Sequence, residues 1–210
     1  MKNENMEIIF NSGSIEYRGQ YLNEQNAIII VEEINKLISL EPDRTFLLDL
    51  SQVKKIEVNA AYEIADLAKI EVDTASPYIF DSVYFGLEHL TEELAKIITK
   101  WPSYFLHLDH ITNLPENVAR QFIGTNHALT FDSCSEFSPD TLKVLVKAAS
   151  FLSLGLSEIN MEQAKVLSNF TGDLILNAEY LPPYILNMLK KNSNLLLPPD
   201  FGVIKITQKE

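Results

Sequence analysis

The chain has a single cysteine, Cys134, among its 210 residues. One cysteine can form neither an intrachain disulfide nor a cysteine-only zinc site, and this favours a reducing compartment. Long apolar runs are also missing: the longest, Ala27–Val31, is far shorter than the roughly 20 residues that span a bilayer. The N-terminal apolar run is too short for a signal peptide. We therefore expect a cytoplasmic protein without a membrane partner, although export without a signal peptide would leave no mark on the sequence.

Basic residues are scarce as well. The chain has 17 lysines and arginines against 29 acidic residues, which gives a net charge of -12. Such a surface repels phosphate backbones, and the adjacent basic pairs Lys54-Lys55 and Lys190-Lys191 are too small to offset this. The sequence also lacks a glycine-rich phosphate loop, a serine nucleophile elbow, a zinc-protease helix motif and a calcium loop. We expect no nucleic-acid partner and no cofactor.

The chain does carry a repeated apolar pattern. An apolar pair separated by one residue recurs at steps of 23, 23, 23 and 22 residues. The pairs begin at Val83, Leu106, Leu129, Leu152 and Leu174. Two further apolar positions follow in each unit at a spacing of three, which places them on one helix face. Self-similarity at such a period indicates a repeat architecture. Each unit is predicted to contain a short strand, a turn and a helix of two to three turns.

Several helix starts are marked by side chains that can cap them. Thr91, Ser138 and Asn160 each precede an acidic first turn, whereas Pro115 brings no capping side chain. We predict an N-terminal cap at 1–44, with a hairpin and a helix at 24–40. The repeats then cover 45–197, with one unit at 48–64 and a short degenerate unit at 70–82 that includes a candidate strand at Ile70–Val72. Residues 198–210 are predicted to form a C-terminal cap with a closing strand at 203–206.

These repeated residues resemble the leucine-rich repeat family, in its bacterial form of about 23 residues with a helix in each unit. The resemblance covers 45–197. It implies an α/β fold, a right-handed β/α solenoid with a parallel sheet on its concave face and helices on its convex face. The family commonly places asparagine or cysteine just beyond the strand. Here Ile111, Cys134 and Leu156 occupy that place, so we expect an apolar inner turn in which Cys134 is a buried core residue.

Side chains alternate along a strand, so Leu106 and Leu108 point inward and His107 points to the concave face. The candidate partner-binding residues share that face. They are Tyr84, Phe105, His107, Asp109, Thr130, Asp132, Phe151, Ser153 and Ile175. Exposed aromatic side chains are anchors that protein interfaces favour. We interpret the chain as a non-enzymatic protein–protein interaction module for a partner that is basic or polar around an apolar centre. The identity of the partner and the oligomeric state stay open.

Two alternatives remain. Phe46–Ile56 resembles the strand–turn–helix of the STAS domains of bacterial anti-sigma-factor antagonists, which implies a regulatory function for the N-terminal third. In that family a serine at the start of the following helix is phosphorylated, but Glu57-Val58-Asn59-Ala60 contains no serine. A stably folded 1–80 fragment would favour this alternative, because repeat units depend on their neighbours.

The second alternative is a metal or acid–base site at His107, Asp109 and Asp132. Metal sites usually need three or four converging ligands, and His110 is predicted to turn away into the loop. A zinc titration followed by thermal shift would reveal such a site.

Overall fold

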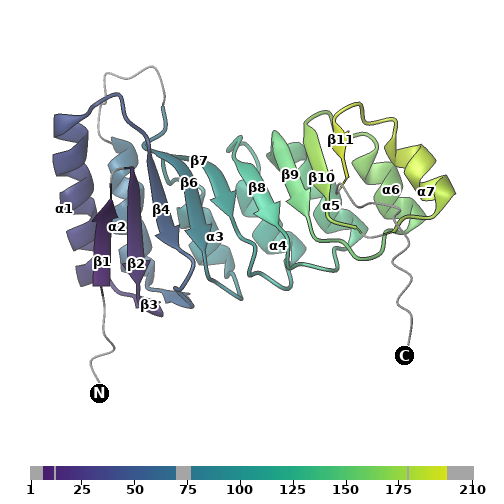
Figure 1. Cartoon of the computed structure of the whole chain (residues 1–210). Coiled ribbons are helices and arrows are strands. Elements are labelled where there is room, and N and C mark those ends of the chain that lie inside the picture. The colour runs from purple at the N-terminus through teal and green to yellow at the C-terminus, as the bar shows by residue number, and fades with distance from the viewer. Residues whose placement is uncertain (1–6, 12, 70–76, 179, 198–210) are drawn as a thin grey trace, which may run out of the picture.

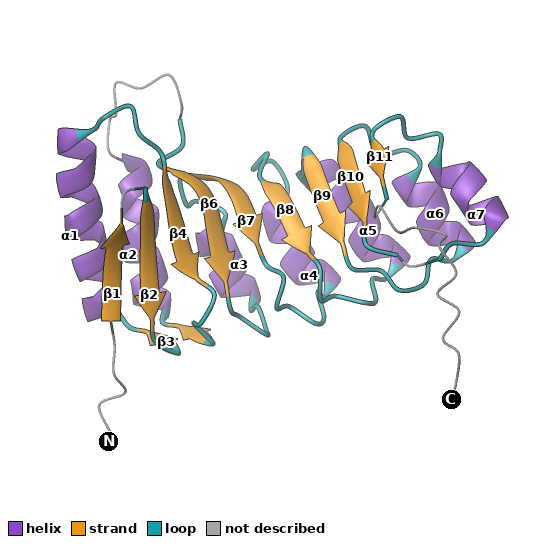
Figure 2. Cartoon of the chain, viewed as in Figure 1, coloured by secondary structure: helices purple, strands orange, loops and turns teal. Residues whose placement is uncertain are grey.

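The structure is a computed structural model that describes residues 7–11, 13–69, 77–178 and 180–197. These residues form a mixed α/β fold built on an open nine-stranded sheet. The helices lie on one face of the sheet, and in the described part of the chain the opposite face carries no helix (Figure 1). Figure 2 shows the same two layers coloured by secondary structure.

The strands of the main sheet follow one another across it almost in chain order. They are β1 (Glu7–Asn11), β2 (Ser14–Arg18), β4 (Phe46–Leu50), β6 (Phe80–Phe85), β7 (Ser103–His107), β8 (Ala128–Phe131), β9 (Phe151–Leu154), β10 (Asp173–Leu176) and β11 (Leu195–Leu196). β1 pairs with β2 in antiparallel fashion, and every other neighbouring pair in this sheet is parallel. Two short strands, β3 (Tyr21–Leu22) and β5 (Lys55–Ile56), form a separate parallel pair.

The helices alternate with the strands from β4 onwards. They are α1 (Glu24–Leu40), α2 (Val58–Ala65), α3 (Glu92–Ile98), α4 (Glu116–Ala119), α5 (Pro139–Ala148), α6 (Met161–Leu167) and α7 (Pro183–Leu189), with 3-10 turns at η1 (Asp66–Lys69) and η2 (Arg120–Phe122). Of the helices in the described ranges, none has both the length and the apolar character needed to cross a membrane.

The core lies between the sheet and the helices. The first residue of each predicted apolar pair faces it, and the strand register sets Leu106, Leu129, Leu152 and Leu174 side by side. All four are fully buried. The helices add the apolar residues that are spaced three apart, such as Leu142 and Leu145 of α5, which are also buried. The predicted strand register from β6 to β10 is therefore confirmed.

Three of the four predicted helix starts are capped by the side chain that precedes them, and the start at Pro115 is not. Thr91 Oγ1, Ser138 Oγ and Asn160 Oδ1 accept backbone N–H groups of the first turns of α3, α5 and α6, at 3.2, 3.0 and 3.0 Å. Pro115 provides no such bond, and α4 has only four residues before it tightens into η2. The α-helix of this unit is therefore shorter than the predicted two to three turns, one α-helical turn followed by a 3-10 turn. The missing cap does not by itself account for this, since α7 also lacks a side-chain cap and has seven residues.

The predicted ends agree with the structure where it describes them. The hairpin forms as β1 and β2, the helix at 24–40 forms as α1, and β11 continues the parallel series. The candidate strands at Ile70–Val72 and at 203–206 lie outside the described residues. Because β4 pairs directly with β6, no strand lies between these two in the sheet. The β3–β5 pair has no counterpart in the predictions.

Candidate functional site

The helix-free face of the sheet, which we call the open face, carries the candidate residues. The register places Tyr84, His107, Thr130, Ser153 and Ile175 in one row across β6 to β10. A second row contains Phe105, Ala128 and Phe151. Asp132 directly follows β8, and Asp109 lies two residues after the end of β7. The two lie beside one another, since the Asp132 N–H reaches the Asp109 carboxylate at 3.2 Å. All nine predicted residues thus lie on neighbouring strands or in the turns that directly continue them.

Four of the rings on this face contact one another. We call Tyr84, Phe105, His107 and Phe151 the aromatic cluster. The rings of Tyr84 and His107 stack with centroids 4.1 Å apart, and those of Phe105 and His107 stack at 5.6 Å. The Phe105 and Phe151 rings meet edge to face at 5.4 Å, across the small Ala128 that separates them in the register. The four side chains are only half-buried, so the cluster offers a preformed apolar surface to solvent.

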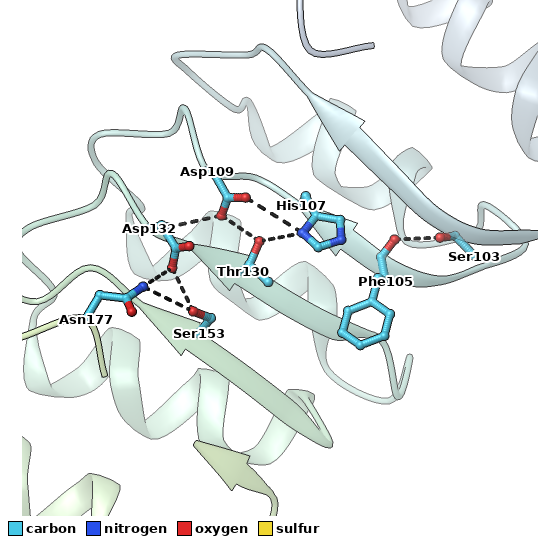
Figure 3. Close-up of polar contacts among 8 residues, drawn as sticks. All are labelled: Ser103, Phe105, His107, Asp109, Thr130, Asp132, Ser153 and Asn177. Carbon is cyan, nitrogen blue, oxygen red and sulfur yellow. Dashed lines mark hydrogen bonds and ion pairs between the residues drawn. The ribbon is translucent and has the colours of Figure 1, made fainter. Parts of the chain in front are cut away.

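A polar network adjoins the aromatic cluster (Figure 3). Thr130 Oγ1 donates to the Asp109 carboxylate at 2.5 Å, and His107 Nδ1 lies 3.2 Å from Thr130 Oγ1 and 3.7 Å from Asp109 Oδ2. The Asp109 carboxylate therefore accepts hydrogen bonds from the Thr130 hydroxyl of β8 and from the N–H of Asp132, which follows β8. It also lies beside the His107 imidazole of β7. These contacts fix its position at the edge of the cluster.

The next strand repeats the arrangement. Ser153 Oγ donates to Asp132 Oδ1 at 2.7 Å, and Asn177 Nδ2 donates to the same oxygen at 2.8 Å. In both cases the aspartate precedes its hydroxyl partner by 21 residues. Thr130 and Ser153 are each only 5% exposed, which corrects the prediction that they are open to a partner. Their hydroxyls hold the aspartates in place instead.

The ionisation of Asp109 reflects this network. Partial burial of the carboxyl would by itself raise its pKa, but the nearby His107 imidazole and the hydrogen bonds from Thr130 and the Asp132 backbone favour the charged form. These contacts prevail, and the pKa of Asp109 is lowered from its ordinary value. The carboxylate is thus stabilised as an anion beside the aromatic cluster.

This lowered pKa predicts that Asp109 contributes to acid sensitivity. Because the folded-state pKa lies below the unfolded-state value, the ionised carboxylate stabilises the fold above about pH 4, and this contribution is lost as the pH falls through the folded-state pKa. The urea midpoint of the wild type should therefore fall more between about pH 6 and pH 3 than that of Asp109→Asn. Asp173→Asn, on the exposed end of the same face, serves as the matched control and should follow the wild type. Equal acid losses in the wild type and in Asp109→Asn would refute the role given to this network.

The residues of the metal hypothesis do not converge. Asp132 directs its carboxylate to Ser153 and Asn177, while His107 approaches Asp109. Within residues 7–11, 13–69, 77–178 and 180–197, no group of three or more histidine, cysteine, aspartate or glutamate side chains is placed to hold a metal. His110 is exposed in the loop, as predicted. Asp132 therefore does not join His107 and Asp109 as the third ligand that the metal hypothesis needs.

Cys134 occupies the inner turn, as predicted from the resemblance. It is fully buried, and its thiol donates to the Glu136 carbonyl at 3.3 Å. Burial raises the pKa of the thiol, so the reactive thiolate is disfavoured. Its surroundings are those of a small core residue.

Two further residues shape this surface. Ala128 lies between the two phenylalanine rings, and Asn177 anchors Asp132, but the sequence identified neither as part of a site. Both occupy the same rows as predicted residues, Ala128 one strand from Phe105 and Asn177 two strands from Asp132. The register was therefore the signal that could have found them.

No family model, curated protein or solved structure matches the chain. The functional argument consequently rests on the residues and on their geometry.

Proposed function

We propose that the protein is a non-enzymatic interaction module that binds a partner protein on its open face. In this proposal the strand–helix units are the turns of a leucine-rich-repeat-like β/α solenoid, with the open face on its concave side. The in-register leucines and the capped starts of α3, α5 and α6 support that architecture. A repeat array of this kind presents one broad, rigid surface made of many short strands.

The aromatic cluster is the observation that carries the proposal. Its rings are half-buried, so they keep contact area available while their neighbours hold them in one orientation. Aromatic side chains that are already ordered lose little conformational freedom on binding, and they are enriched among residues that dominate interface energies. The cluster lies on the face of the sheet and not at its edge, so a partner that paired with an edge strand would not contact it. A partner that packs against the open face would cover it.

The charges around the cluster indicate the chemistry of the partner. Four aspartates lie on the open face from β4 to the end of β10: Asp49, Asp109, Asp132 and Asp173. The open-face rows of β4 and β6 to β10 contain no lysine or arginine among the described residues. A partner surface with an apolar centre and flanking lysines or arginines complements this arrangement, and its cations could also approach the faces of the rings.

Affinity capture from cells of the source organism tests this proposal. The wild type is compared with the triple variant Tyr84→Ala/Phe105→Ala/Phe151→Ala. A matched control, Lys143→Ala/Lys165→Ala, alters the exposed surface of α5 and α6 on the helix side. We expect a captured protein to be lost with the triple variant and retained with the control, and its capture to weaken with rising salt. Capture of the same proteins by all three forms would overturn the proposal.

The STAS-like alternative is favoured by one feature, the departure of the N-terminal part from the repeat pattern. This part contains a hairpin, the 17-residue α1 and the separate β3–β5 pair. At the start of α2, where that resemblance implies the phosphorylated serine, Glu57 accepts the Glu24 N–H and the Tyr21 hydroxyl. Capture that survives the triple variant but is lost with Glu57→Lys would favour a regulatory contact at this place.

A further inference from the structure

We propose that two copies of the chain associate through their β1 strands, which pair in antiparallel fashion about a twofold axis at Ile9. Among the described residues, β1 is the terminal strand of the sheet and has β2 as its neighbour on one side. Its other edge carries backbone N–H and C=O groups that a further strand can pair with. This inference does not depend on the open face.

The two ends of the sheet differ in how they protect their edges. Natural edge strands are commonly blunted by proline, lysine, a bulge or short length. At the far end, β11 has only two residues, and Pro198-Pro199 follow it closely in the sequence. β1 has five residues, Glu-Ile-Ile-Phe-Asn, with neither proline nor lysine and with an unbroken register against β2. Within the part of the chain that the structure describes, the β1 edge is thus the less protected of the two.

The hairpin register identifies which backbone groups point outward. Asn11 and Ser14 pair on either side of a two-residue connection, and Glu7 pairs with Arg18. In an antiparallel ladder, hydrogen-bonded and non-hydrogen-bonded pairs alternate, and the pair that closes a two-residue connection is hydrogen-bonded. Ile8 and Phe10 therefore direct their N–H and C=O groups away from β2, towards the free edge.

The outward groups are self-complementary. With the axis at Ile9, Ile8 lies opposite Phe10 of the second copy, and the two outward residues of each copy exchange hydrogen bonds with those of the other. Glu7 then lies opposite Asn11 of the second copy, so no like charges meet directly. Ile8 and Phe10 are also apolar and lie on the same side as Ile15 and Tyr17, with Phe10 39% exposed. Pairing would cover this exposed ring.

A second copy is the occupant that these features favour. Two identical edges brought together by a twofold axis perpendicular to the sheet are antiparallel automatically, and each supplies the same groups that the other needs. A strand from a different protein would need a matching apolar pair and is the competing outcome of the test.

Cysteine cross-linking in the full chain tests the register. Ile9 would face Ile9 of the second copy in a non-hydrogen-bonded pair, where the Cα atoms are about 4.5 Å apart and within disulfide range. Ile9→Cys should therefore form a covalent dimer rapidly under mild oxidation. Glu7→Cys is the matched control on the same strand, because its two copies would be separated by roughly 13 Å. The native Cys134 is buried and does not compete. Equal or absent cross-linking in the two variants would overturn the inference.

Sedimentation over a concentration series provides the second test. The wild type should approach twice its mass of 23.8 kDa as the concentration rises. Phe10→Pro removes an outward N–H without removing a bond to β2, and it should weaken the dimer by about tenfold or more. Phe10→Ala keeps that N–H and should weaken the dimer less. A wild type that stays monomeric, or a dimer that Phe10→Pro leaves unchanged, would overturn the inference, and binding of a foreign strand by a monomer would assign the edge to that partner.

Discussion

Replacing Gly155 with alanine is expected to destabilise the protein by about 3 kcal/mol or more. Gly155 follows β9 directly, and its N–H donates to the Phe131 carbonyl of β8 at 3.1 Å. A Cβ at this position would lie 1.8 Å from the backbone oxygen of Asp132. That oxygen belongs to the chain rather than to a flexible side chain, so β8 and β9 would have to separate locally. The same shift would disturb the bond between Asp132 and Ser153.

Gly124→Ala is the matched control for this prediction. Gly124 has a φ of +83°, but a Cβ there would meet nothing within 4 Å. Only the left-handed backbone conformation opposes the alanine, at a cost of about 1 kcal/mol. Urea unfolding followed by circular dichroism compares the two variants with the wild type. Similar losses in both would contradict the close approach of the two strand ends at Gly155.

Replacing Trp101 with alanine is expected to lower the free energy of unfolding by about 3 to 5 kcal/mol. Trp101 follows α3 closely and is 2% exposed. Its ring lies 5.3 Å from that of Phe85, and its indole N–H donates to the Ala61 carbonyl of α2 at 3.0 Å. The variant would leave a cavity and would remove a bond that joins residues 40 positions apart. It should therefore weaken the attachment of the N-terminal third to the remaining units.

Trp101→Phe separates the two contributions. Phenylalanine fills most of the space but cannot donate to Ala61, so the expected loss is about 1 to 2 kcal/mol, for the lost indole hydrogen bond and the smaller ring. Circular dichroism is the suitable probe, because Trp101 is the only tryptophan in the chain. A loss in Trp101→Ala no greater than that in Trp101→Phe would contradict the packing role of the ring.

The sequence predicted the sheet register because two periods agree. Side chains alternate with a period of two along each strand, and the units recur every 22 or 23 residues, so Leu106, Leu129 and Leu152 had to share a face. The short β3 and β5 strands could not be predicted, since two residues are too few to show any alternation. The shortness of α4 could not be predicted from its uncapped start, because α7 lacks a side-chain cap as well and has seven residues.

The candidate site was predicted in position but not in exposure. The register gave the neighbours of His107 and Phe105 correctly. It could not show that Thr130 and Ser153 donate their hydroxyls to the preceding aspartates, because those bonds depend on the turn geometry beyond each strand. The hydrogen bond from the Trp101 indole to Ala61 could not be predicted from the sequence for a similar reason. Ala61 approaches it only after α2 and α3 pack together.

Site-specific photo-crosslinking in living cells is the most direct test of a binding surface on the open face. A benzophenone side chain at position 84 would stand in the aromatic cluster, and one at position 143 would stand on the exposed surface of α5. The proposed function predicts a discrete covalent adduct from the crosslinker at position 84 and none of the same mass from the crosslinker at position 143. Adding Phe105→Ala/Phe151→Ala should reduce the yield of the adduct at position 84. Adducts of equal yield at both positions, or at position 143 alone, would contradict a partner on the open face.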